Sequence, residues 1–438
     1  MESSAFDPSR TLIGRYVRLE PLRPSDAPEI LAAGRDVEVQ RWLRHRPGDT
    51  LEGARDYVER YQPGVAAGTA VLYAVRLAEG GRFLGVTGFH RLSRDDGSVE
   101  IGGTWLTRAA WRTAVNTDMK LAMLRHAFDD AGLHRVTLQT HHANARSQRA
   151  IADLGAVREA EFRDDVLQED GTWRTSIVYG ILRSEWPTVR SRLDARLRAP
   201  WDPAGLPPPS PGEAALSLPR PQTSPPSWAM AFRVPRRLEG PTIELLPLER
   251  AWVPALARAG HDPAVWQWLR IGPAQTEEQM SALVDDLLRL QDAGEVLAFV
   301  VRSRPLDRVV GMFRYLHIDR PNGCVELGTW LAPDRWRTGT NSEVKFLALS
   351  HAFDTERFHR VGLRTDLLND RSQRAIERLG ARREGVLREH VRLGDGRFRS
   401  SVCYSILDRE WPVVRSRLSA SVERLATASA RTEEPASR

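Results

Sequence analysis

The hydrophobic pattern alternates between short apolar runs and helical periods, most clearly in the second half of the chain. Runs of apolar and β-branched residues predict strands at 296–303, 309–318, 325–331, 360–366 and 396–407. Apolar residues three and four apart predict helices at 248–260, 276–292, 370–379 and from 342 onward. Gly380 is placed to end helix 370–379, and Pro412 suits the first turn of a last helix. This order predicts an α/β fold in which about four helices flank a sheet.

The same pattern occurs twice, about 225 residues apart. HAFDDAGLHRVTLQT (126–140) matches HAFDTERFHRVGLRT (351–365), and EWPTVRSRL (185–193) matches EWPVVRSRL (410–418). Because the matching unit is long, it indicates a duplicated domain and not a short-period solenoid. We therefore predict two domains, at 9–198 and 234–423. Ten of the 28 prolines lie in 199–233 and predict a linker, and 424–438 is expected to be a disordered tail.

Composition and charge narrow the class of protein. The chain has 438 residues, of which 41% are hydrophobic and 27% charged, as in soluble globular proteins. A net charge of +6 spread over a chain of this length produces only a weak electrostatic field, so a nucleic-acid partner is not expected. Two cysteines, Cys324 and Cys403, have no metal-ligand spacing. With no signal-peptide pattern and no run of 18 apolar residues, we expect no membrane association and a cytoplasmic location.

A repeated phrase carries the only two lysines among 63 basic residues. AWRTAVNTDMKL (110–121) contains Lys120, and RWRTGTNSEVKF (335–346) contains Lys345. A solvated ammonium is the ordinary expectation for a lysine early in a helix. Duplication explains why both copies have a lysine, but not why neither became arginine. The sequence does not show which atoms the two ammonium groups contact.

The phrase joins a predicted strand to a predicted helix through a tight turn. A helix start carries unpaired N–H groups and a partial positive charge, and a small residue there lets phosphate oxygens approach. Gly339 is that residue in copy two, Ala114 takes its place in copy one, and Arg337 and Arg112 could pair with phosphate. An ordinary turn with glycine chosen for positive φ is the alternative interpretation.

Together these motifs resemble the GNAT superfamily of acetyl-CoA-dependent N-acetyltransferases. The phrase, the H-x-F helix, the HRV strand, the N-x-R-S-Q-R-A-I-x-x-L-G-A segment and the E-W-P helix carry the resemblance in both copies. More narrowly, the chain resembles the Rim-type branch of this superfamily, which is related to ribosomal-protein N-terminal acetyltransferases. The resemblance implies a mixed sheet in which two parallel strands separate, with the CoA pantetheine arm in the gap. It implies no metal.

The resemblance also assigns the residues of a cosubstrate site. In copy two the pyrophosphate turn would comprise Trp336, Arg337, Thr338, Gly339, Thr340, Asn341 and Ser342. In copy one the corresponding candidates are Arg112, Thr113, Ala114, Val115 and Asn116, preceded by Trp111. The family normally has glycine where copy one has Ala114. A methyl group at a position of positive φ would cost on the order of 1 kcal/mol. We therefore expect copy two to be the active one and copy one to be weak or a packing platform for the substrate groove.

A second signature, N-x-x-S, follows the next strand. In the family the asparagine, here Asn369 or Asn144, holds the pantetheine arm, and a hydroxyl near the sulfur protonates the departing thiolate. The tyrosine that many members use as this acid is replaced by Ile376 and Ile151. Ser372 and Ser147 are then the catalytic candidates. The alternative is that each asparagine simply caps its helix.

Transfer to an amine requires that the amine lose a proton. At pH 7 an α-amine of pKa about 7.8 is roughly one-seventh neutral, and a lysine amine far less, so a base must act directly or through water. Glu326, and Glu100 in copy one, is the leading candidate, facing away from Val325 and Leu327; a solvated or paired carboxylate is the alternative. Glu389 and His390 are reserves. Trp266, Trp268 and Trp42 are either pocket-lining or core aromatics.

The sequence thus predicts an N-acetyltransferase that moves acetyl from acetyl-CoA to a primary amine by direct attack. The acceptor would be a protein N-terminus or a small molecule. Acceptor identity, acyl length and oligomeric state stay open. The rival hypothesis is a non-catalytic acyl-CoA-binding or scaffold protein, which the missing tyrosine and altered turns favour. A different acyl donor or a natural-product acceptor is a third alternative.

Overall fold

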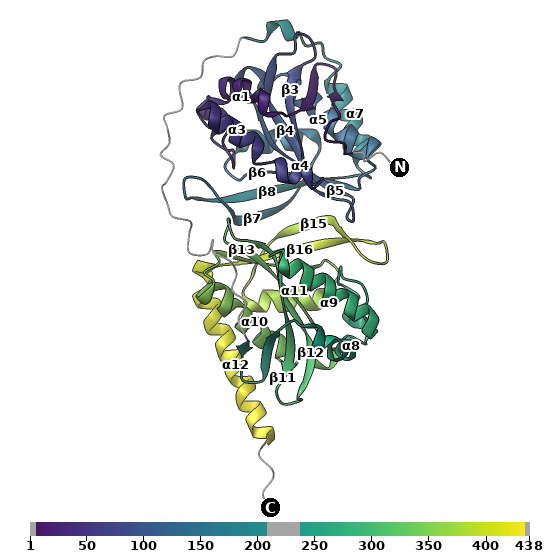
Figure 1. The fold of residues 1–438 in the computed structure, drawn as a ribbon, viewed down its shortest axis with the longest axis vertical. Coiled ribbons are helices and arrows are strands. Elements are labelled where there is room, and N and C mark those ends of the chain that lie inside the picture. Colours follow the sequence, from purple (N-terminus) through teal and green to yellow (C-terminus); the bar gives the residue numbers. More distant parts are fainter. Residues whose placement is uncertain (1–5, 208–236, 434–438) are drawn as a thin grey trace, which may run out of the picture. The chain divides into compact units, whose positions relative to one another are not determined.

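Each half of the chain forms a compact unit of its own. The computed structural model describes residues 6–207 and 237–433 (Figure 1). The chain divides into unit 1, Met1–Gln222, and unit 2, Thr223–Arg438. The duplication predicted from the repeats therefore corresponds to two separately packed units, which are described one at a time.

Unit 2 is a mixed eight-stranded sheet with helices on both faces. Its strands are β9 (Leu238–Glu239), β10 (Ile243–Pro247), β11 (Val296–Ser303), β12 (Arg308–Asp319), β13 (Cys324–Leu331), β14 (Arg360–Asp366), β15 (Arg382–Arg392) and β16 (Phe398–Leu407). Its helices are α8 (Val253–Ala259), α9 (Glu277–Asp292), α10 (Thr340–Ser350), α11 (Asp370–Leu379) and α12 (Trp411–Glu433). The order is β9-β10-β11-β12-β13-β14-β16-β15, and β13 and β14 are the parallel pair.

Unit 1 repeats this topology. Its strands are β1 (Leu12–Ile13), β2 (Val17–Pro21), β3 (Val71–Leu77), β4 (Phe83–Ser93), β5 (Ser98–Leu106), β6 (Arg135–His141), β7 (Val157–Leu167) and β8 (Trp173–Leu182). Its helices are α1 (Ala27–Gly34), α2 (Val37–Gln40), α3 (Leu51–Glu59), α4 (Gln62–Ala66), α5 (Ala114–Arg125), α6 (Ala145–Leu154) and α7 (Trp186–Arg196). The order β1-β2-β3-β4-β5-β6-β8-β7 again contains one parallel pair, β5 and β6. The predicted α/β class and mixed sheet are confirmed.

Alternation along the strands builds two cores in each unit. In unit 2, Val325 and Leu327 face a core with α10, α11 and α12, whereas Trp330 faces a core with α8 and α9. In unit 1 the corresponding cores lie under α5, α6 and α7, and under α1 and α3. We call the first surface of each sheet the main-helix face and the second the early-helix face. Glu326 lies two full strand periods before Trp330 and therefore belongs to the early-helix face, as predicted.

The predicted elements of the second half are found within a few residues of their expected bounds. Gly380 ends α11 with φ of 95°, as expected for a helix stop. β9, β10 and β15 were not predicted. The expected disordered tail is wrong for residues 424–433, because α12 continues to Glu433. The segment from Val413 to Glu433 contains neither glycine nor proline and is rich in alanine, so nothing interrupts the helix.

The start of the predicted linker packs onto unit 1. Trp201 contacts Tyr16 edge to face, with ring centroids 5.2 Å apart, and Leu206 is buried. Most of the predicted linker, from 208 onward, lies outside the described residues, as do 434–438. The proposed domain bounds at 9–198 and 234–423 stay predictions.

Candidate active site

The two parallel strands of each unit separate partway along their length. β13 pairs with β14 only from Cys324 to Leu327, although β13 runs on to Leu331. In unit 1, β5 pairs with β6 from Ser98 to Ile101 and runs on to Leu106. Beyond these points the facing backbone edges of the two strands are not joined in a ladder. The gap begins beside Gly328 in unit 2 and beside Gly102 in unit 1.

A turn with unusual backbone conformation leads from the separated strand to the main helix. Arg112 and Arg337 have φ of 62° and 63°, in the left-handed region that non-glycine residues rarely adopt. The hydroxyl of the following threonine, Thr113 or Thr338, donates to the backbone carbonyl of Ala110 or Arg335, respectively, at 2.8 and 2.9 Å. Both arginine side chains are exposed. The turn thus presents a cation and the first N–H groups of the helix on the same side of the chain.

The strain expected at Ala114 is absent. Thr113 caps α5 by accepting from the N–H of Val115 at 3.2 Å, and Ala114 is the first helical residue. In unit 2 the helix begins one position later, and Gly339 is its N-cap with φ of 90°. The positive φ that we expected at Ala114 is therefore wrong, and alanine is a good residue at a first helical position; which copy is active stays a prediction.

Gly339 has a packing role as well as a conformational one. A Cβ added there would lie 2.4 Å from a methyl carbon of Leu425 on α12. A larger side chain at 339 would therefore push against α12 whether or not a phosphate binds. The glycine that the sequence assigned to the cosubstrate is thus also required by the fold of unit 2.

Two arginines that the sequence analysis did not single out lie over the turn. Arg146 stacks on Trp111 and Arg371 on Trp336, with guanidinium carbons 3.4 and 3.5 Å from the ring centroids. Burial lowers the pKa of both arginines, and the neighbouring turn arginine lowers it further in each unit; Glu38 and Asp36 oppose the shift of Arg146. The sequence could have indicated them, since the third position of N-A-R-S and N-D-R-S is arginine in both copies.

The tryptophans anchor these arginines to the sheet. Each indole N–H donates to a carbonyl at the end of the preceding strand, Leu106 or Leu331, at 2.8 and 2.9 Å. Among the described residues, no carboxylate forms an ion pair with the turn arginines or with the stacked arginines. Two guanidinium groups that form no ion pair, beside a helix start, are the donor set that a diphosphate needs. The residues present therefore fit the CoA diphosphate.

The N-x-x-S asparagines are helix caps. Asn144 accepts from the N–H of Ser147 at 3.1 Å, and Asn369 accepts from the N–H of Ser372 at 3.0 Å. The capping alternative is therefore confirmed for both. The serine hydroxyls are half-buried, and in the described part of the chain no hydrogen bond engages them. Their candidacy as thiolate acids stays a prediction.

The two lysines are buried, contrary to the expectation of a solvated ammonium. Lys120 Nζ donates to Thr104 Oγ1 at 2.8 Å, and Lys345 Nζ donates to Thr329 Oγ1 at the same distance. Both are 5% exposed, and burial lowers the pKa of each to about 7. Each lysine therefore reaches from the main helix to the strand that borders the gap. A compact ammonium suits one hydroxyl partner, whereas arginine would bring five donors to an apolar site.

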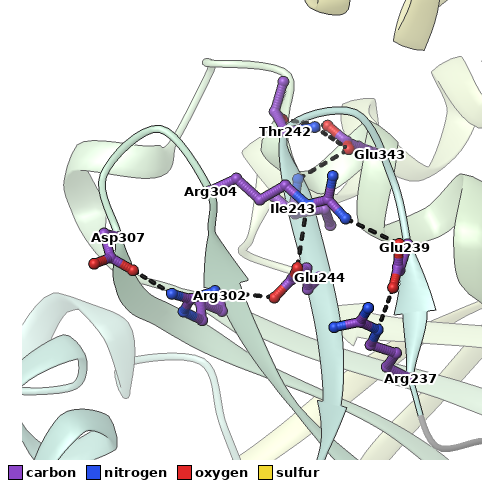
Figure 2. Close-up of polar contacts among 9 residues, drawn as sticks. All are labelled: Arg237, Glu239, Thr242, Ile243, Glu244, Arg302, Arg304, Asp307 and Glu343. Atoms are coloured by element: carbon purple, nitrogen blue, oxygen red, sulfur yellow. Dashed lines mark hydrogen bonds and ion pairs between the residues drawn. The ribbon is translucent and has the colours of Figure 1, made fainter.

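A buried carboxylate ties the main helix of each unit to its first strands. Glu343 Oε1 accepts from the N–H groups of Thr242 and Ile243 at 2.8 and 3.0 Å, and Oε2 accepts from the Thr242 hydroxyl (Figure 2). Asp118 accepts from three successive N–H groups, of Arg15, Tyr16 and Val17, in the same way. A Cβ at Gly14 or Gly240 would collide with this carboxylate, at 2.4 or 2.2 Å. The clamp fixes the helix start that follows the turn.

The candidate bases Glu100 and Glu326 lie on the early-helix face at the start of the gap, and their ion-pair partners differ. Glu326 pairs with Arg364 at 3.2 Å, and both are partly buried. Glu100 pairs at 3.1 Å with Arg91, whose side chain is 64% exposed, and accepts from Gln139 at 3.2 Å. The paired alternative holds for both residues. An exposed partner is screened by solvent, so Glu100 is the less firmly held of the two.

Unit 1 adds a histidine that the sequence analysis missed. His90 on β4 lies directly across from Glu100 on β5, and its buried Nε2 has no hydrogen-bond partner among the described atoms. Burial lowers its pKa, an effect that Glu100 opposes, so the imidazole is neutral at pH 7. Leu316 occupies the equivalent place across from Glu326. The sequence offered little indication of this histidine, because it is a single residue in a strand where the two copies match weakly.

The extra residue in EIGGTWL forms a bulge next to this histidine. The β4–β5 register shifts between Val86 and Gly88, and Gly103 has φ of 61°. A Cβ at Gly103 would lie 3.2 Å from His90 Nε2, so the ring faces the bulge. In unit 2 the pairing of β12 with β13 has no such shift over Gly311–Leu316 of β12. The bulge and His90 together distinguish the early-helix face of unit 1.

The remaining candidates are structural or peripheral. Trp266 is buried against Trp330 with ring centroids 5.3 Å apart, which confirms the core alternative. Trp42 packs on His141, and the Trp268 carbonyl accepts from Arg399, so both flank the early-helix face. The reserves lie on β15, where the Glu389 N–H donates to Ser400 and the His390 ring contacts Ser401.

Two further chemistries find no support in the described residues. Over 6–207 and 237–433, no three His, Cys, Asp or Glu side chains are grouped to hold a metal ion. Cys403 is buried, and burial raises the pKa of its thiol to about 11, which keeps it protonated at neutral pH. No helix in the same ranges has the length and apolar character to cross a membrane.

Comparison with known proteins identifies the family. The model of the acetyltransferase (GNAT) domain matches residues 17–157 and 242–382, which together are more than half of the chain. The chain therefore belongs to the GNAT acetyltransferase family and contains the domain twice. It is an acyltransferase, and the GNAT fold uses acetyl-CoA.

Single-domain relatives match one unit's length at a time. The uncharacterized N-acetyltransferase p20 of Bacillus licheniformis is 26% identical over 170 residues, which are 39% of this chain and 94% of that protein. A crystal structure of a GCN5-related N-acetyltransferase from Brucella melitensis is 28% identical, with TM-score 0.41, covering 43% of this chain and 86% of that one. Mycobacterium smegmatis RimJ in complex with CoA-disulfide is 20% identical with TM-score 0.38, covering 42% and 92%.

Proposed function

We propose that the protein moves an acetyl group from acetyl-CoA to a primary amine by direct attack in a ternary complex. The observation that carries this proposal is the arrangement found in both units. Two parallel strands separate beside a helix start that carries two arginines without an ion pair among the described residues, and a carboxylate lies at the same point on the other face. A cosubstrate held from one face and an acceptor arriving at the other would meet in the gap.

The diphosphate of CoA would be held by backbone N–H groups of the first helical turn and by the arginine pair. In unit 1 the pair is Arg112 and Arg146, and in unit 2 it is Arg337 and Arg371. Stacking on tryptophan fixes the second arginine of each pair in place before the ligand arrives, which lowers the entropic penalty of binding. The pantetheine arm would then lie in the gap, with Ser147 or Ser372 as the hydroxyl nearest to the next helix start.

Unit 1 is the better placed to remove a proton from the amine. Glu100 would take the proton directly or through water, and the neutral His90 beside it offers a second acceptor. In unit 2, Glu326 is held by Arg364, and a hydrophobic Leu316 stands in place of the histidine. We therefore assign the main acetyl transfer to unit 1, reversing the expectation drawn from Ala114.

The acceptor is a protein N-terminus, as in the Rim-type branch, or a small-molecule amine. An α-amine needs the least help, because a larger fraction of it is already neutral at pH 7. Non-catalytic acyl-CoA binding, the second candidate, fits unit 2 best, since its carboxylate is engaged by arginine while its diphosphate turn is complete.

Release of CoA thiol, followed with a panel of peptide N-termini and small amines, tests the proposal. We expect amine-dependent release from the full chain, and calorimetric binding of the unreactive desulfo-CoA. Binding without release for any amine would leave only the acyl-CoA-binding function. No heat with either acetyl-CoA or desulfo-CoA would overturn both.

A further inference from the structure

The early-helix face of unit 2 contains a buried arginine with no partner. Arg314 on β12 is 8% exposed, and within the described residues no hydrogen bond or ion pair engages its guanidinium. Burial lowers its pKa to about 10, so it remains charged at neutral pH. Burying an unpaired charge is strongly unfavourable, and native proteins rarely do so without a counter-charge.

Arg314 lies where the two parallel strands begin to separate. It is directly across from Gly328, the first residue of β13 beyond the parallel ladder. A Cβ at Gly328 would lie 3.6 Å from one guanidinium nitrogen of Arg314. The guanidinium therefore covers the glycine at the start of the gap, on the face opposite the diphosphate turn.

Glu326 attracts the Arg314 guanidinium electrostatically, which opposes the effect of burial on its pKa, but the two side chains form no ion pair. Glu326 pairs with Arg364 at 3.2 Å, and Asp366 pairs with Arg397 at 3.6 Å. Arg399 donates only to neutral acceptors, the Ser401 hydroxyl at 3.1 and 3.2 Å and the Trp268 carbonyl at 3.0 Å. Both carboxylates of this cluster are thus already in ion pairs with other arginines. Among the described residues, neither Arg314 nor Arg399 forms an ion pair of its own, although Glu326 attracts both.

Arg314 and Arg364 have no arginine counterpart in unit 1, whereas Arg399 corresponds to the buried Arg174. At the position of Arg314 unit 1 has Gly88, where a Cβ would lie 2.9 Å from the Val71 carbonyl and 3.1 Å from His90 Nε2. At the position of Arg364 it has Gln139. Duplication therefore does not account for the additional cations, which belong to a face that diverged.

We propose that the early-helix face of unit 2 binds a small molecule through its carboxylate, which Arg314 grips as the counter-charge that the protein lacks, with Arg399 beside it. A planar carboxylate matches the two parallel N–H groups of a guanidinium. The side chains grow more exposed from Arg314 through Glu326 (15%) to Arg364 (28%), which gives the direction of entry. Binding here requires no catalysis by unit 2.

Ligand-observed NMR on the full chain tests this with N-acetylglycine as the probe and N-acetylglycinamide as its uncharged match. Neither has a primary amine, so acetyl transfer cannot contribute to the signal. We expect N-acetylglycine to bind and the amide to bind at least about tenfold more weakly, since a charge-assisted pair is lost. Equal binding of the two probes would overturn the assignment.

Variants locate the site. R314M should weaken N-acetylglycine binding by about tenfold or more without lowering thermal stability, because it removes an unpaired buried charge. R314K keeps the charge but not the planar fork, so it should bind with intermediate strength and serves if R314M does not fold. The matched control is R304M, whose arginine already pairs with Glu239 and Glu244 (Figure 2). Unchanged binding in R314M or R314K, or an equal loss in R304M, would refute the site.

Discussion

The main-helix faces of the two units are nearly the same, whereas their early-helix faces have diverged. Both main-helix faces keep the tryptophan-stacked arginine, the buried lysine on a strand threonine, the capping asparagine and the carboxylate clamp. On the early-helix face, His90 and a bulge in unit 1 are replaced by Leu316 and a regular strand in unit 2. After duplication, the surface suited to the cosubstrate was retained and the surface suited to the acceptor changed.

The difference teaches that a complete turn motif does not by itself identify the active copy. The glycine of unit 2 fits the family pattern, yet that unit has its candidate base in an ion pair with arginine. The alanine of unit 1 departs from the pattern, yet it is accommodated by starting the helix one residue earlier. Catalytic competence therefore has to be assessed on both faces of the sheet.

The largest expected effect is on catalysis and distinguishes the two candidate bases, Glu100 and Glu326. E100Q should lower kcat/KM for the amine by about 10² to 10⁴-fold, as expected when a general base is lost, and H90A should also lower it. The unit 2 counterparts E326Q and L316A should stay within about twofold of the parent. Thiol release at saturating acetyl-CoA measures all four. A larger loss in E326Q than in E100Q would return the main activity to unit 2.

The second-largest effect is expected on cosubstrate binding, when the tryptophan-stacked arginines Arg146 and Arg371 are replaced. R146A should weaken binding of desulfo-CoA to unit 1 by about tenfold to a hundredfold, because one charge-assisted phosphate contact is lost. R371A should do the same for a second, separate binding event. Calorimetry resolves this as two sites in the parent and one in each variant. If neither variant changes the isotherm, the stacks are structural only.

The two helix starts should respond differently to small substitutions. G339A should destabilise unit 2 by about 2 kcal/mol, since it adds a methyl group at positive φ and against Leu425. A114G should destabilise unit 1 by less than about 1 kcal/mol, the usual effect of glycine in a helix. Urea unfolding measures both. Partial recovery in G339A/L425A would confirm the packing contribution, and equal effects in the two units would contradict it.

The smallest effect concerns the lysines and depends on pH. Burial lowers the pKa of Lys120 and Lys345 to about 7, so the unfolded chain binds more protons than the folded one between pH 7 and the ordinary lysine pKa. Each lysine therefore destabilises the fold most below pH 7 and progressively less as pH rises. K120M and K345M should raise Tm by a few degrees at pH 6 and by less at pH 9.5. An increase that is as large or larger at pH 9.5 would show that burial does not lower the pKa of these lysines.

The fold could be predicted because its evidence is local and repeated. Strand and helix periods, helix stops such as Gly380, and two copies of each pattern pointed to the same elements. What escaped prediction depends on distant partners. β15 carries charged residues at most positions and is held by pairing with β16, which sequence periodicity does not reveal.

The site was only partly predictable for the same reason. The turn and the N-x-x-S caps lie within a few residues of each other, so their spacing was informative. Whether Lys120 is solvated depends on Thr104 across the core, and whether Ala114 is strained depends on where the helix starts. His90 becomes a candidate only because it lies beside Glu100. The two are brought together by strand register and not by proximity in the sequence.

The carboxylate clamp has a consequence for how the chain can be cut. Asp118 and Glu343 are each held by N–H groups about a hundred residues earlier in the chain. Trimming unit 1 past Val17, or unit 2 past Ile243, would leave a buried carboxylate without its donors and release the helix that it holds. An expression clone of the second half that starts after Ile243 should therefore yield aggregated material, whereas one that retains the β9–β10 hairpin keeps the acid's partners.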